Sequence, residues 1–289
     1  MTTTELPIGV FDSGMGGLTV MRELMYSLPN ESFIYLGDTA RLPYGTKSQE
    51  TVKQYALQMA TLLIHLNIKL LVIACNTATT AALSYLQQQF PHLPIIGVVE
   101  PGAQAAVNAT HNKKIALLAT ETTIRSGIYQ KIIQTLDPEI EVFCQSCGLF
   151  VALAEEGCIN DEIAQVTTRK YLAPLLNQST PCDVVILGCT HFPVLSTTIA
   201  AAFQTSVSII NSGKATAKIV TAILQQTQLL NLTKPAERYF LVTDLPERFV
   251  RIGEIFLKQP IDPNRVMLVD GFTKNPSSPS TTLFTEPGS

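Results

Sequence analysis

Two apolar runs, each ending in a cysteine, constrain the fold of this chain most strongly. Residues 70–77 read LLVIACNT, and residues 183–191 read DVVILGCTH. Runs of this length, rich in Val, Ile and Leu, are typical of strands buried in a parallel sheet. Ligands of open α/β sheets bind at the carboxyl ends of the strands. We therefore expect Cys75 and Cys189 to face each other across one small site.

Strands and helices are predicted to alternate along the rest of the chain. Helices are expected near residues 103–110 and from about 124 to 136, among others. The pattern predicts an α/β fold of two similar domains with mostly parallel sheets. Further strands are predicted at 8–11, 33–36, 95–99, 115–119, 141–144, 207–210, 239–243 and 266–269.

Breaks in the pattern predict where one domain ends and the other begins. Glu-Pro-Gly at 100–102 and Asn-Ser-Gly at 211–213 interrupt the alternation. We expect a first domain of residues 1–100 and 211–272, and a second of 101–210. Residues 273–289 are rich in Ser, Thr and Pro, which predicts a disordered tail.

Composition limits the class of function. The 289 residues are 46% hydrophobic and 15% charged, which supports a large core. A net charge of −3 and a pI near 5.8 give no basic surface for nucleic acid or an anionic membrane. Residues 1–6 lack a secretory signal, and no apolar run approaches the roughly 18 residues of a membrane span. These features predict a cytoplasmic protein.

The other four cysteines give weaker indications of a functional site. In a reducing cytosol all six should be thiols, and Cys144, Cys158 and Cys182 are interpreted as core residues. Cys144 and Cys147 form a C-x-x-C pair. A single pair is a weak signal of a metal or redox site, because a structural zinc site needs four ligands. Coincidence is the favoured interpretation.

A glycine-rich segment follows the first predicted strand. Residues 12–17 read DSGMGG and precede a predicted helix at 18–27, which has the outline of a phosphate loop. However, Thr19 occupies the third glycine of the dinucleotide fingerprint, and no Walker lysine follows. The glycines could instead let the backbone approach a small ligand, with Asp12 and Ser13 aimed into the site. Asp12 could equally cap the helix.

The helix after the first cysteine strand is expected to begin near Asn76. The Asn76 side chain can cap its free N–H groups. Those N–H groups and the helix dipole favour an anion such as a carboxylate.

Two facing thiols could bind a metal, form a disulfide or move protons. The metal site lacks a convincing fourth ligand, and a disulfide would need the sulfurs in contact, with no substrate between them. In proton transfer, one thiolate removes a proton from carbon and the opposing thiol protonates the other face, which inverts the centre. A free thiol has a pKa of about 8.5 and is mostly protonated at neutral pH. Each cysteine therefore needs a neighbouring base or charge to form its thiolate. His191 is placed to serve Cys189, and Asp12 could serve Cys75.

Four motifs together resemble the glutamate racemases of the aspartate/glutamate racemase family. They are FDSGMGG at 11–17, PYG at 43–45, ACNT at 74–77 and GCTHFP at 188–193, in a match that spans about residues 7–270. The resemblance implies interconversion of L- and D-glutamate without cofactor or metal, which supplies D-glutamate for peptidoglycan. It also implies that the second domain is inserted into the first, that the site lies in the cleft between them, and that the protein is a homodimer.

The resemblance also implies roles for individual residues. Cys75 would act on the D-isomer and Cys189 on the L-isomer. Asp12, Glu155 and His191 would assist them, and Glu155 fits the family spacing better than Glu156. The implied substrate contacts are Asp12, Ser13, Tyr44, Gly45, Asn76, Thr77, Thr120, Thr190 and His191.

Three alternatives to glutamate racemisation stay open at this point. The same two-thiol plan could racemise another substrate, such as aspartate or a hydantoin. A non-catalytic role, inhibition of a DNA topoisomerase, is reported for some relatives, although nothing basic in the sequence supports it. The thiols could also form a metal-binding module.

Overall fold

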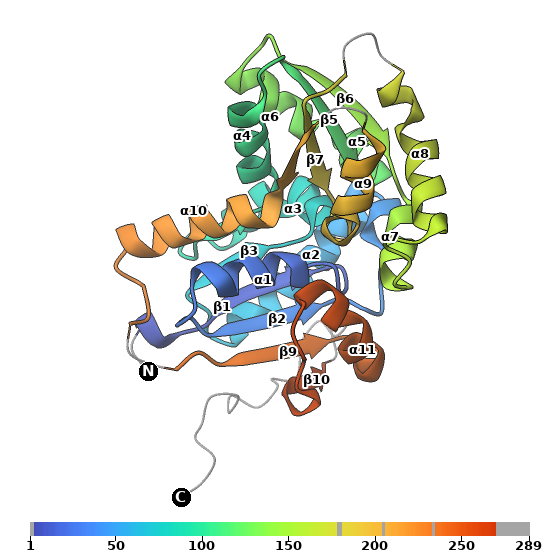
Figure 1. Cartoon of the computed structure of the whole chain (residues 1–289). Coiled ribbons are helices and arrows are strands. Elements are labelled where there is room, and N and C mark those ends of the chain that lie inside the picture. The colour runs from blue at the N-terminus through green and yellow to red at the C-terminus, as the bar shows by residue number, and fades with distance from the viewer. Residues whose placement is uncertain (1–2, 178–180, 204–205, 233–234, 270–289) are drawn as a thin grey trace, which may run out of the picture.

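The strands of the protein form two sheets (Figure 1). A computed structural model describes residues 3–177, 181–203, 206–232 and 235–269. Every strand pairing in these residues is parallel, so the prediction of an α/β fold with parallel sheets is confirmed. The tail predicted at 273–289 lies outside the described residues. None of the described helices has the length and hydrophobicity needed to span a membrane.

The first sheet combines strands from both ends of the chain. Its strand order is β10-β9-β2-β1-β3-β4. The strands are β1 (Ile8–Asp12), β2 (Phe33–Gly37), β3 (Leu70–Ile73), β4 (Ile95–Gly97), β9 (Arg238–Val242) and β10 (Val266–Leu268). Core clusters on the two faces join it to five helices. One face carries α1 (Leu18–Ser27), α10 (Ser212–Gln226) and α11 (Pro246–Leu257), and the other carries α2 (Gln49–His65) and α3 (Asn76–Gln89).

The second sheet has the order β6-β5-β7-β8. Its strands are β5 (Lys114–Ala119), β6 (Glu141–Ser146), β7 (Val184–Gly188) and β8 (Ser208–Asn211). Two further core clusters cover its faces. One face carries α7 (Leu149–Glu155), α8 (Glu162–Leu176) and α9 (Ser196–Ala202), and the other carries α4 (Val99–Ala109), α5 (Glu121–Ser126) and α6 (Ile128–Leu136).

The two sheets with their helices stack as two bodies (Figure 1). We call residues 3–98, 212–232 and 235–269 the first lobe, and residues 99–177, 181–203 and 206–211 the second lobe. Short 3₁₀ turns complete them: η1 (Thr3–Glu5), η2 (Tyr44–Thr46), η3 (Phe192–Leu195) and η4 (Pro263–Arg265).

The two cysteine strands, β3 and β7, lie inside their sheets. All four residues of β3 are fully buried, and so are Val184, Val185 and Ile186 of β7. Each such side chain contributes about 1.5–3 kcal/mol when it leaves water. This burial holds the ends of both strands in place, and with them the cysteines that follow.

Two predictions of helix boundaries were wrong, and one helix was not predicted. Helix α4 begins at Val99, and Pro101 lies in its first turn, where a missing N–H costs no hydrogen bond. The helix expected up to residue 136 is divided into α5 and α6 at Gly127, whose φ is 67°. Helix α11 was not predicted at all.

Candidate active site

A small cavity lies between the lobes, at the carboxyl ends of the strands. Its volume is about 20 Å³, room for about one water molecule. The first lobe lines it with Ser13, Pro43, Tyr44, Gly45, Cys75, Asn76 and Thr77, and the second lobe with Thr120, Val151, Cys189, Thr190 and His191. Larger hollows of about 480 Å³ lie over α8 and α9 and beside α10, away from both cysteines. With this volume and lining, the cavity between the lobes is nearly closed.

Cys75 lies two residues after the end of β3 and caps α3. Its sulfur accepts the N–H of Ala78 at 3.4 Å, and its S–H donates to the Ser13 hydroxyl at 3.7 Å. The prediction that Asn76 caps this helix was wrong, because Asn76 is already its first residue. Burial raises the pKa of Cys75 to about 12, and the charge of Asp12 acts in the same direction. At neutral pH, Cys75 is therefore an uncharged thiol.

Asp12 is the last residue of β1 and is fully buried. Its carboxylate accepts the N–H of Gly14 at 3.0 Å and the hydroxyl of Thr190 at 3.3 Å. Burial raises its pKa, although the charge of His191 opposes this. The cap position of α1 is Gly17, so Asp12 binds the glycine loop and the second lobe instead of serving as that cap.

The glycine loop brings the first lobe against the second. A Cβ atom at Gly16 would lie 2.5 Å from both His191 Nδ1 and Thr190 Oγ1. The Thr19 hydroxyl donates to the Thr190 carbonyl oxygen at 2.9 Å. The close approach that glycine permits here is thus to side chains of the opposite lobe.

Cys189 follows β7 and begins a chain of polar contacts. Its sulfur lies 3.8 Å from His191 Nδ1, and His191 Nε2 lies 3.0 Å from Glu155 Oε1. Burial lowers the pKa of His191, but its hydrogen bonds with Cys189 and Glu155 outweigh this and raise the pKa to about 10. Burial raises the pKa of Glu155, yet the contacts with His191 and Arg248 leave it below its usual value. An imidazolium and a carboxylate therefore accompany Cys189.

Neutral polar groups surround the cavity between the cysteines. The Thr77 hydroxyl of the first lobe lies 3.0 Å from that of Thr120 and 3.1 Å from that of Thr123, both in the second lobe. The Tyr129 hydroxyl donates to Asn76 Oδ1 at 2.7 Å. This hydrogen bond fixes the amide of Asn76, which lines the cavity.

The Pro-Tyr-Gly turn closes another side of the cavity. A Cβ atom at Gly45 would lie 2.5 Å from Thr120 Cβ, so this turn also touches the second lobe. The Tyr44 hydroxyl donates to the carboxylate of Asp38, which also accepts from Arg41 at 2.7 Å and Thr243 at 3.0 Å. Asp38 thus fixes the aromatic wall of the cavity.

The structure brings the predicted site residues together. All of them line the cavity except Asp12 and Glu155, which reach it through Thr190 and His191. Asp38, Thr123 and Tyr129 were not predicted. A signal existed for Asp38, because it directly follows the buried strand β2, and Asp12 likewise lies at the carboxyl end of β1.

The C-x-x-C cysteines do not share a site. Cys147 packs into the same core cluster as Cys189, whereas Cys144 packs on the cluster at the other face of the second sheet. Within the part of the chain that the structure describes, no group of three or more His, Cys, Asp or Glu side chains could hold a metal ion.

Comparisons with known proteins agree on one family. Residues 8–220 match the family model described as Asp/Glu/Hydantoin racemase. A glutamate racemase of Geobacter metallireducens is 47% identical over 251 residues, 86% of this chain and 92% of that protein. One of Syntrophus aciditrophicus is 42% identical over 252 residues, 87% of this chain and 92% of that protein.

A solved structure shares the architecture. The crystal structure of glutamate racemase from Francisella tularensis in complex with D-glutamate superposes with a TM-score of 0.86 at 38% identity, covering 93% of this chain and 99% of that one. The resemblance carried by the four sequence motifs is confirmed, and the chain belongs to the Asp/Glu/hydantoin racemase family.

Proposed function

We propose that this protein is a cofactor-independent glutamate racemase that uses Cys75 and Cys189 as its two acid/base groups. The observation that carries the proposal is that thiols from opposite lobes line one closed cavity, each with polar partners of its own. The D-glutamate held by the Francisella relative supports glutamate as the substrate. The product would be D-glutamate for peptidoglycan synthesis.

Proton transfer from L-glutamate begins at Cys189 in this proposal. The Cys189 thiolate takes the α-proton, so the C–H bond breaks, an S–H bond forms, and the electron pair stays on the α-carbon. The Cys75 thiol then donates its proton to the opposite face and becomes a thiolate. D-glutamate reacts by the same steps in reverse. His191, together with Glu155, assists the proton transfer at Cys189, and Asp12 assists the proton transfer at Cys75.

Neutral donors would hold the substrate carboxylates. Among the residues that the structure describes, those that line the cavity include no lysine or arginine. Instead the site offers the Asn76 amide, the N-terminal end of α3 and the hydroxyls of Ser13, Thr77, Thr120 and Thr190. Apart from the His191 imidazolium beside Cys189, a further cation near the cysteines would stabilise both thiolates and make them weaker bases. Binding of the substrate carboxylates by uncharged donors therefore suits a reaction in which thiolates must remove a carbon-bound proton.

We extend the proposal to the organisation of the protein. Residues 1–100 with 211–272 would form one domain and 101–210 the other, and the two would separate to admit substrate. The division of strands between two sheets supports this boundary. We also propose a cytoplasmic homodimer, and light scattering on the purified protein would measure its mass against the 31.5 kDa of one chain.

Exchange in deuterium oxide tests the proposed reaction. Purified protein with L-glutamate and no added cofactor should show loss of circular dichroism and gain of deuterium at the α-carbon. Cys75→Ala and Cys189→Ala should each abolish racemisation, whereas Cys158→Ala, outside the cavity, should not. Absence of both inversion and exchange in the wild type would refute the proposal. Inversion of aspartate or a hydantoin in its place would establish the alternative substrate.

A further inference from the structure

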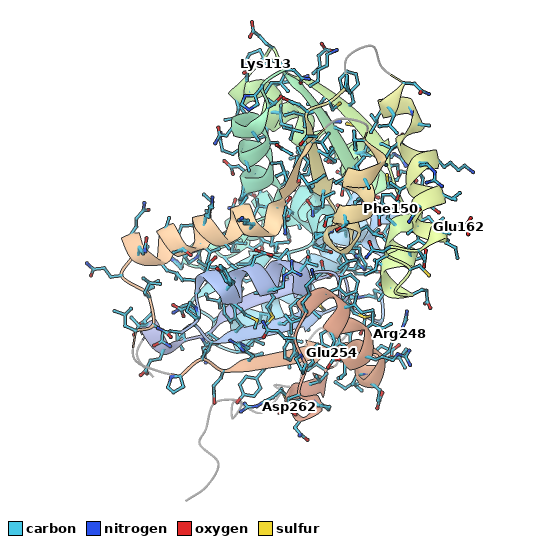
Figure 2. The ribbon with its side chains drawn as sticks, in the orientation of Figure 1. Lys113, Phe150, Glu162, Arg248, Glu254 and Asp262 are labelled. Atoms are coloured by element: carbon cyan, nitrogen blue, oxygen red, sulfur yellow. The ribbon has the colours of Figure 1, made fainter. Side chains whose placement is uncertain are left out.

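Helix α11 of the first lobe reaches α7 of the second at the edge of the active site (Figure 1). Arg248 belongs to α11 and is labelled beside this helix in Figure 2. Its Nη2 atom lies 3.3 Å from Glu155 Oε2 and 3.5 Å from Glu156 Oε1. An ion pair therefore joins the two lobes at the carboxylate that contacts His191.

The two oxygens of Glu155 are divided between the lobes. Oε1 lies 3.0 Å from His191 Nε2 in the second lobe, and Oε2 lies 3.3 Å from Arg248 Nη2 in the first. The Glu155 side chain is 9% exposed and that of Arg248 is 30% exposed. A carboxylate held at both oxygens has little freedom to rotate, so Arg248 restricts the orientation in which Glu155 meets the imidazole.

Helix α11 also contacts His191 itself. The ring of Phe256 packs edge-on against the His191 ring, with centroids 5.2 Å apart. Phe249 and Phe256 are fully buried in the core of the first lobe, so the helix is anchored there. Both members of the His191–Glu155 pair are thus braced by a helix of the opposite lobe.

We propose that Arg248 is a positioning residue, which holds Glu155 from the first lobe and thereby keeps His191 directed at Cys189 when the lobes are closed. The inference rests on the proposed function, because Cys189 needs His191 in this orientation only if Cys189 transfers protons. The contact of Arg248 with Glu155 supports that orientation in the closed state. When the lobes separate, Arg248 leaves with the first lobe and Glu155 loses one of its two partners.

Steady-state kinetics test this role. Arg248→Gln should lower kcat about three- to tenfold with a smaller change in KM, and Arg248→Lys should recover part of the loss. The matched control is Arg251→Gln, an exposed arginine on the same helix, which should keep wild-type rates. Equal rates for Arg248→Gln and Arg251→Gln would overturn the proposal.

Isotope effects locate the defect on one side of the site. Slower proton removal by Cys189 makes that step more rate-limiting. The α-deuterium isotope effect of Arg248→Gln should therefore rise more with L-glutamate than with D-glutamate. A rise of equal size with both isomers would mean that Arg248 serves the site as a whole, and would contradict the assignment to Cys189.

A titration of His191 tests the geometry without relying on activity. NMR of ¹³C-labelled histidines, with the His191 signal assigned from His191→Gln, would follow its protonation. Charged or titratable groups face it from three other elements: Asp12 at the end of β1, Glu155 on α7, and Arg248 on α11 through Glu155; Cys189 faces it from its own segment.

The direction of the shift separates two roles of Arg248. Loss of a cation alone would raise the pKa of His191, whereas loss of the Glu155 orientation would lower it. We expect Arg248→Gln to lower it by about half a pH unit, and Arg251→Gln to leave it unchanged. An unchanged or raised value would overturn the proposal. An inactive wild type would refute the racemase function, but this titration would still decide whether Arg248 positions the pair.

Discussion

The two cysteines of the site sit in different chemical surroundings. Cys75 is an uncharged thiol that caps a helix and contacts Ser13. Cys189 lies beside His191, which is cationic because Glu155 and Cys189 outweigh its burial. The closed protein is therefore asymmetric, with a proton donor on the Cys75 side and a charged pair on the other.

The raised pKa of His191 predicts a pH-dependent contribution to stability. Its value of about 10 in the folded protein exceeds the roughly 6.5 expected when unfolded. The charged form thus stabilises the fold fully below about pH 6.5, and this contribution is lost as pH rises towards 10. Compared with His191→Gln, the wild type should gain on the order of 2–5 kcal/mol at pH 6 relative to pH 10.

Urea unfolding of both proteins across this pH range measures that difference. His92→Gln, a change at an exposed histidine, is the matched control. A wild-type advantage that stays constant with pH would show that the imidazolium does not stabilise the fold.

Tyr129 is predicted to act through Asn76. Tyr129→Phe removes the hydroxyl that donates to Asn76 Oδ1, so the amide is free to rotate away from the substrate. One hydrogen bond is worth about 0.5–1.5 kcal/mol, so KM for glutamate should rise about two- to tenfold with less change in kcat. Tyr26→Phe, at a side chain that is 88% exposed, should leave both constants unchanged. A lower kcat at constant KM would argue against this orienting role.

At the residue scale, the sequence could predict the positions of side chains that lie at strand ends. Cys75 and Cys189 each follow an apolar run, so their meeting at one cavity could be predicted. Tyr129 and Arg248 could not, because they reach the site through partners 53 and 93 residues away in the sequence. Such contacts depend on how the lobes pack, which local patterns do not encode.

The glycine loop after β1 is predicted to tolerate no side chain where it meets the second lobe. Gly16→Ala would place a methyl group 2.5 Å from His191 and Thr190, so the lobes could not close fully. We expect kcat/KM to fall by about 5- to 150-fold, since overpacking costs about 1–3 kcal/mol. Gly148→Ala, where a Cβ atom meets nothing within 4 Å, is the control and should retain activity. Wild-type kinetics for Gly16→Ala would show that the closed contact is dispensable.

The elements of the fold were predicted well where apolar patterns were long and uninterrupted. Strands β3 and β7 and helix α1 lie close to their predicted positions. Helix α11 was missed, although Phe249, Ile252, Phe256 and Leu257 follow the spacing of a buried helical face. The start of α4 was misplaced because Pro101 was interpreted as a break, whereas proline is compatible with a first helical turn.

At the scale of the whole molecule, the near-closed cavity predicts that access to the cysteines depends on lobe opening. Cys75 and Cys189 are 5% and 8% exposed. Iodoacetamide should therefore label them slowly, and saturating glutamate should slow the labelling further by favouring the closed state. Peptide mass spectrometry would compare them with the partly exposed Cys158, which should be unaffected by glutamate. Labelling of all three at one rate, with or without glutamate, would exclude this gating.

The order of strands in the first sheet could not be predicted from local sequence patterns. A return of the chain near residue 211 was expected, but nothing in the local sequence specifies which edge the returning strands join. The structure pairs β9 with β2, Phe33 opposite Arg238. This choice depends on complementary packing between segments about 200 residues apart.

That pairing has a consequence for biosynthesis. The β9-facing edge of β2 stays uncovered until residues 238–242 have left the ribosome. Translation at roughly 5–20 residues per second makes this interval about 10–40 s. An unpaired edge can recruit wrong strands, so nascent chains and stop-codon fragments that end before β9 should need chaperone protection and should precipitate without it.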